Sequence, residues 1–241
     1  MRRRRRWRRA SASSGRAVRG GGSGASGPPS DGAGRESVAA PAGVMGTGRM
    51  EAFSDGVIAV AITLLVLDLR VPDADGARSL ADALGALWPN YLAYVISFLA
   101  IGIIWINHHT LMRRLAGADR SVLALNLVLL MCIAVLPFTT SLMATYLDVP
   151  GGRLAAVVYA TAFLVTSAVF LALEAHVLLR RPHLLRAPLP AGERRAVLRR
   201  GALAPPAYLL AGLLGLATPY LTLAVCVLMG LFYLAGPRRG G

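Results

Sequence analysis

The sequence predicts an all-α membrane protein with six transmembrane helices. Of its 241 residues, 55% are hydrophobic and only 16% are charged, and the mean hydropathy is +0.56. The apolar residues gather in runs long enough to cross a bilayer as helices, which takes about 20 residues. Four such runs cover residues 50–69, 87–106, 121–146 and 154–179.

The last apolar run, residues 202–235, is expected to form two helices. As a single helix its 34 residues would rise about 51 Å, well beyond the ~30 Å apolar core of a bilayer. Pro219 lacks a backbone donor and is the natural place for the chain to turn. This turn brings the predicted number of spans to six.

The distribution of arginine predicts the orientation, because basic residues in short loops stay on the cytoplasmic side. The connections after spans two and four and the C-terminal end are rich in arginine, whereas the connections after spans one and three mix arginine with aspartate. The first set contains Arg113, Arg114, Arg120, Arg180, Arg181, Arg186, Arg194, Arg195, Arg199, Arg200, Arg238 and Arg239, and the second contains Arg70, Asp73, Asp75, Arg78, Asp82, Asp148 and Arg153. We therefore expect a multi-pass protein of the cell membrane with both termini in the cytoplasm.

The two ends of the chain are not expected to join the transmembrane domain, residues 49–235. Residues 1–48 are rich in Gly, Ser and Arg, a composition that cannot bury a core and predicts disorder; residues 236–241 form a short C-terminal tail. The net charge of +14 and the opening R-R-R-R-R-W-R-R could suit nucleic acid. However, the chain contains no lysine, which is typical of codon bias in a GC-rich genome, so no nucleic-acid partner is predicted.

The first span combines an acidic residue with an apolar stripe. At 100° per residue, one face carries Phe53, Gly56, Val60, Thr63, Leu64 and Leu67. Asp55 projects roughly 120° away from this stripe, on the side of Ala59, Ile62 and Val66, and is expected to meet a neighbouring helix because a lone ionisable group in a membrane is costly. Periodicity alone leaves open whether the stripe serves ordinary helix packing or function.

Two motifs connect the chain to a known family. Arg49, Phe53, Ser54 and Asp55 have the spacing R-x-x-x-F-S-D at the start of span one, and W-I-N-H-H at residues 105–109 ends span two. With six spans over residues 45–235, this pattern resembles the endosomal and lysosomal potassium channels of the transmembrane protein 175 family, especially their bacterial members.

The resemblance implies a homotetramer whose four first helices surround a potassium-conducting pore within the lipid bilayer, without the T-V-G-Y-G filter of other potassium channels. By position after F-S-D, it places the main apolar constriction at Val60, further narrow layers at Leu64 and Leu67, and the selectivity layer at Thr63. The family more often has Ile or Leu where this chain has Val60, so Leu64 could be the effective gate.

The remaining motif residues are expected to form a structural polar network at the cytoplasmic ends of spans one and two. Its members are Arg49, Phe53, Ser54, Asp55, Trp105, Asn107 and His108. Metal binding is not predicted, because adjacent histidines on a helix diverge by 100° and no third ligand is evident. No cofactor is predicted either.

Two other classes of membrane protein would show different sequence patterns. A secondary cation transporter or proton-coupled transporter should contain repeated, broken helices, and F-S-D does not recur in the second half; this class stays as the alternative. A membrane enzyme should present clustered nucleophiles, bases or ligands, whereas the acids here are few and scattered, so no enzymatic activity is expected.

Overall fold

The computed structural model describes residues 46–72 and 79–236. Within these ranges the chain is helical apart from turns, loops and one isolated bridge between Leu115 and Leu185. Nearly all of the tail predicted to be disordered, the loop residues Asp73, Asp75 and Arg78, and the last five residues lie outside the described part.

Four helices of the described chain are long and apolar enough to cross a membrane, and they coincide with the first four predicted spans. Helix α1 (Thr47–Leu64) continues as a 3-10 turn, Leu65–Asp68. Helices α3 (Trp88–Arg114) and α4 (Arg120–Tyr146) follow, and α5 (Gly152–Ala175) runs on as a π-helical turn, His176–Arg180. The all-α membrane class predicted from the sequence is therefore confirmed.

The C-terminal apolar run forms two helices, α7 (Ala204–Gly215) and α8 (Pro219–Leu234), as predicted from Pro219. Their 12 and 16 residues rise about 18 and 24 Å, less than the ~30 Å apolar core. The total of six spans thus stays a prediction, supported by four long helices and two short ones.

Two further helices were not expected from hydropathy, because the first is too short for a membrane span and the second is short and polar. Helix α2 (Leu80–Ala86) begins at Ser79, whose hydroxyl oxygen accepts a hydrogen bond from the Asp82 backbone N–H at 3.2 Å. Such an N-cap satisfies a donor that the first turn leaves free. Helix α6 (Ala191–Gly201) lies within the arginine-rich connection after α5.

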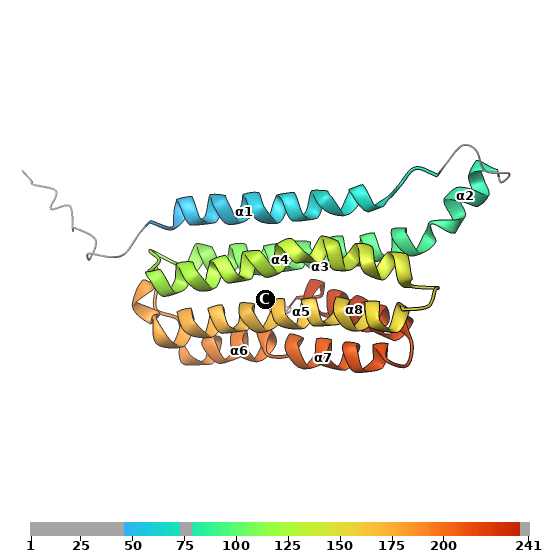
Figure 1. Ribbon diagram of the computed structural model, residues 1–241. Helices are drawn as coiled ribbons and strands as arrows, with labels where there is room; N and C mark the ends of the chain where they lie inside the picture. The colour runs from blue at the N-terminus through green and yellow to red at the C-terminus, as the bar shows by residue number, and fades with distance from the viewer. Residues whose placement is uncertain (1–45, 73–78, 237–241) are drawn as a thin grey trace, which may run out of the picture. The chain divides into compact units, whose positions relative to one another are not determined.

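Helix α1 packs against α3 and α4, while α5, α7 and α8 pack on the other side of that pair (Figure 1). The residues of α1 that face the bundle recur every three or four positions, which is one stripe of a helix. They are Met50, Ser54, Ile58, Ala61 and Leu65. Within the described part of the chain, the helices that contact α1 lie on this side, and its opposite side is uncovered.

Candidate functional site

The uncovered side of α1 contains the apolar stripe that the sequence singles out. The exposed fractions are 57% for Phe53, 57% for Val60, 43% for Leu64 and 70% for Leu67. Thr63 lies on the same exposed side, and its hydroxyl donates to the Val60 backbone carbonyl at 2.9 Å. This bond occupies the hydroxyl proton and leaves oxygen lone pairs that can approach a cation.

An apolar groove follows this side of α1 and reaches α4 at Ala134. Its walls include Phe53, Val57, Val60 and Leu64. Large apolar patches on the surface of a chain commonly mark contact with another chain or with lipid. The groove and the stripe together therefore form a surface that residues 46–72 and 79–236 leave uncovered.

A buried chain of hydrogen bonds fixes the opposite side of α1 to α4 and α3. Ser54 Oγ donates to the Met50 backbone carbonyl at 2.8 Å and accepts from Asn126 Nδ2 at 2.9 Å. Asn126 Oδ1 then lies 2.8 Å from His108 Nε2. Because the amide oxygen can only accept, the imidazole donates here, and the direction of every bond in the chain is set. Buried polar networks of this kind specify one packing arrangement of the helices.

A second polar contact joins α1 to α3 at Asp55, the residue after Ser54. Trp105 Nε1 donates to Asp55 Oδ1 at 2.8 Å, so the carboxylate meets the neighbouring helix through its indole. Glu51, one turn before Asp55, lies beside His109, with 3.1 Å between Glu51 Oε1 and His109 Nδ1. These contacts lie on the flank of α1, away from its exposed stripe.

The residues of the predicted polar network therefore lie in several separate places and do not form one network. Ser54 and His108 belong to the buried chain, Asp55 and Trp105 form the flanking contact, and Arg49 and Phe53 are exposed. Asn107 donates to the Ile103 carbonyl of its own helix at 3.0 Å and lines a pocket on the far side of α3. The structure does not bring Asn107 to Asp55 or Ser54.

Sequence reasoning missed Asn126, which links all three helices. The signal was present: an amide inside an apolar span is costly unless it is partnered, so Asn126 could have been nominated as a network member. Its partners on α1 and α3 could not have been read from the α4 sequence alone. Glu51 was missed for a similar reason, since only the tertiary structure places it next to His109.

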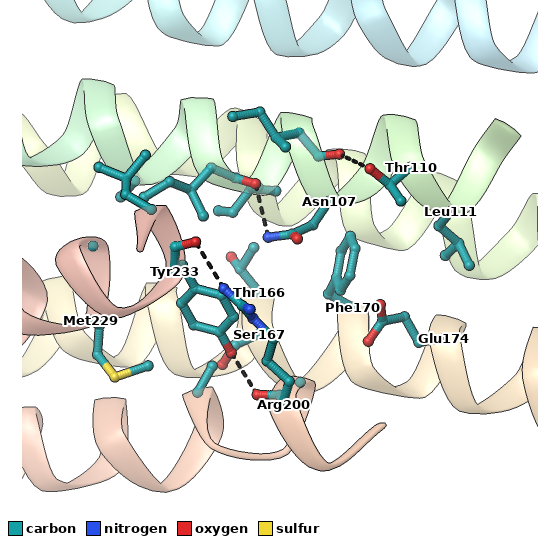
Figure 2. A pocket seen from close by; sticks show the side chains of 18 of the residues that line it. Asn107, Thr110, Leu111, Thr166, Ser167, Phe170, Glu174, Arg200, Met229 and Tyr233 are labelled. Carbon is teal, nitrogen blue, oxygen red and sulfur yellow. Dashed lines mark hydrogen bonds between the residues drawn. The ribbon is translucent and has the colours of Figure 1, made fainter. Parts of the chain in front are cut away.

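The pocket beyond α3 has a volume of about 440 Å³ and is bounded by α3, α5, α6, α7 and α8 (Figure 2). Arg200 donates to the Tyr233 backbone carbonyl at 2.8 Å, and the Tyr233 hydroxyl donates to the Arg200 carbonyl at 2.9 Å. Glu174 and Asn107 also border the pocket. Its walls combine apolar and polar side chains, and it lies on the side of α3 that faces away from α1.

The fold and the exposed apolar helix define a multi-pass α-helical membrane protein. Residues 49–137 match the family described as the endosomal/lysosomal potassium channel TMEM175. A potassium channel of Streptomyces collinus is 45% identical over 188 residues, which cover 78% of this chain and 91% of that protein. The chain belongs to the TMEM175 family, a family of ion channels, as the F-S-D and W-I-N-H-H motifs indicated.

Other relatives agree in fold and in sequence. The crystal structure of a lysosomal potassium-selective TMEM175 homologue from Chamaesiphon minutus superposes with a TM-score of 0.71 at 38% identity, covering 78% of this chain and 96% of that one. The human endosomal/lysosomal proton channel TMEM175 is 34% identical over 174 residues; these cover 68% of this chain but 34% of the human protein.

Proposed function

We propose that this chain is one subunit of a potassium channel whose pore is lined by α1. The observation that carries the proposal is the uncovered apolar stripe on the helix that begins with F-S-D. Bacterial relatives named potassium channels, which this chain matches over more than 90% of their length, support the choice of ion. One chain cannot surround a pore with a single helix, so several copies are needed, and the family resemblance favours four.

The pore closes and opens through dehydration rather than covalent chemistry. Rings of Val60, Leu64 and Leu67 side chains would empty a narrow pore of water, and a slight widening would admit a partly hydrated ion. A ring of Thr63 oxygens would replace some of the lost water. Because valine is smaller than the Ile or Leu more usual at that position, Leu64 forms the narrowest ring in this proposal.

The buried hydrogen-bond chain supports this arrangement mechanically. By fixing Ser54 to Asn126 and His108, it determines which side of α1 faces the bundle and hence which side faces the pore axis. The helix is thereby held in one rotation, and small shifts of the whole helix change the diameter of the apolar rings.

The proposed orientation places both termini in the cytoplasm of a cell whose membrane the protein crosses. The two arginine-rich connections lie together at one end of the helices. The Arg186 backbone N–H donates to the Arg114 carbonyl at 2.8 Å, and Arg181 pairs with Asp119 at 2.9 Å. Their joint position at one end is what a cytoplasmic face requires under the positive-inside rule.

The test is ion flux through purified protein in planar bilayers, with two matched serine variants of α1. The unmodified protein should pass a current that reverses near the potassium equilibrium potential. Leu64→Ser should wet the apolar rings and raise the resting conductance several-fold, whereas Ile62→Ser, half-buried beside the bundle, should not. Thr63→Ala should lower the preference for potassium while a current persists.

Each contrary outcome points to a different error. Equal leak from Leu64→Ser and Ile62→Ser would show that the exposed stripe does not line the pore. A saturating flux coupled to a second ion would favour the transporter class. A current that follows the proton gradient instead of the potassium gradient would make this chain resemble the animal relatives named proton channels.

A further inference from the structure

We propose that Glu51, Asp55 and His109 form a binding site for a divalent transition-metal ion between α1 and α3. Each residue offers one ligand atom, and these three atoms all lie within 4.8 Å of one another. Glu51 and Asp55 are one turn apart on α1, so their carboxylates share one side of that helix. The proposal rests on this geometry and not on ion conduction.

His109 supplies the observation that points to a ligand. Its Nδ1 atom is buried and makes no hydrogen bond, and its nearest polar contact is the ion-pair distance of 3.1 Å to Glu51 Oε1, while 36% of the His109 side chain stays exposed. Buried side-chain nitrogens almost always make a hydrogen bond, whereas this one has only a carboxylate contact, with a second carboxylate close by. A cation among the three atoms would satisfy the imidazole lone pair and both carboxylates at once.

Trp105 holds two of the three candidate ligands in position. Its Nε1 donates to Asp55 Oδ1 at 2.8 Å, which leaves the second carboxylate oxygen for a metal. Its ring stacks on the His109 imidazole, with 5.7 Å between the ring centroids and 25° between the planes. Groups that orient metal ligands from outside the coordination sphere commonly change affinity by about 10- to 100-fold.

The donor set selects the class of ion. One imidazole and two carboxylates suit Zn²⁺, Co²⁺, Ni²⁺ or Mn²⁺, while an imidazole is a poor ligand for the alkali and alkaline-earth cations. Bond lengths of about 2.0–2.2 Å place neighbouring ligand atoms roughly 3–3.5 Å apart, so the three side chains need to close by about 1 Å around the ion. Water would complete the coordination from the exposed side.

Sequence reasoning about a metal considered the two adjacent histidines and missed the ligands on the other helix. The adjacent histidines do diverge, and His108 is turned into the buried chain toward Asn126. Only His109 faces α1, and the two missing ligands come from the other helix. An ion bound here would clamp the first turns of α1 to the end of α3.

Trp105 serves as a built-in reporter for the test, because Co²⁺ and Ni²⁺ quench a nearby indole. The protein would carry Trp7→Phe and Trp88→Phe, which leaves Trp105 as its one tryptophan. We expect Co²⁺ or Ni²⁺ to quench Trp105 fluorescence saturably and Zn²⁺ to compete with this quenching. Calorimetry on protein without an affinity tag should count one bound ion per chain. His109→Gln and Glu51→Gln should each weaken binding at least about tenfold.

Matched controls are His183→Gln and Glu193→Gln, which change the same residue types in the connection after α5 and should leave the affinity unchanged. Circular dichroism would verify that each variant is folded. Saturable binding that both α1/α3 variants weaken and both controls retain would establish the site. No saturable quenching up to about 1 mM metal, or equal affinity in His109→Gln, Glu51→Gln and the unmodified protein, would overturn it.

Discussion

Replacing Asn126 with alanine is expected to lower the free energy of unfolding by about 2–4 kcal/mol. The change removes two hydrogen bonds that tie α4 to α1 and α3. Interhelical hydrogen bonds in membrane proteins average about 0.6 kcal/mol each. The larger cost comes from the fully buried His108 side chain. Its Nδ1 atom has no hydrogen-bond partner, and the substitution would also remove the partner of Nε2. A buried polar group left without a partner costs about 1–3 kcal/mol.

The assay is reversible unfolding of purified protein in detergent micelles titrated with dodecyl sulfate. Ser54→Ala should cost less, about 1 kcal/mol, because it strands only the Asn126 amide. Val165→Ala, at an exposed position of α5, is the control and should stay within about 0.5 kcal/mol of the unmodified protein. The double variant Ser54→Ala/Asn126→Ala should be no less stable than Asn126→Ala alone, since the shared bond is already lost. A loss below about 0.5 kcal/mol for Asn126→Ala would refute the assignment of the hydrogen-bond chain as a structural element.

Two further predictions concern orientation and packing. In a cysteine-free background, Arg153→Cys should react with a membrane-impermeant maleimide added to intact cells, while Arg195→Cys should stay protected. The reverse labelling pattern would show that the predicted topology is the wrong way round. Gly215→Ala should destabilise the protein by about 1–3 kcal/mol, because the added methyl group would lie 2.5 Å from Thr222 Oγ1. Gly212→Ala, one turn earlier, should be nearly neutral by the same unfolding assay, since its methyl group would lie 3.5 Å from the Ala160 Cβ.

Hydropathy predicted the long helices well but not their ends. The second predicted span stops at residue 106, whereas α3 continues to Arg114. The residues beyond 106 are largely polar but remain helical, and hydropathy detects apolar runs rather than helices. Helix α2 has only seven residues and α6 is rich in arginine, so a signal built on long apolar runs could not predict either.

The candidate site was predictable where helical geometry decides and unpredictable where tertiary contacts decide. The 100° periodicity grouped Val60, Leu64 and Leu67, which the structure leaves on the uncovered side of α1. Periodicity does not say which side packs against neighbours. Depth in the membrane grouped Asn107 with His108, but adjacent helical residues point about 100° apart, and the two side chains enter different environments.

The short length of α7 and α8 has a consequence for the surrounding lipid. Helix α4, with 27 residues, rises about 40 Å, while α7 and α8 rise only about 18 and 24 Å. Where α7 and α8 cross the bilayer, as proposed, the apolar thickness of the protein differs around its perimeter, and acyl chains beside these two helices must shorten or tilt to match it. Arg200 donates to the carbonyl of Tyr233 near the end of α8, and a long charged side chain at a helix end can reach the polar headgroups. Bilayers of shorter acyl chains should relieve this mismatch, so the fatty-acid composition of the membrane becomes a determinant of how firmly the last two helices are held.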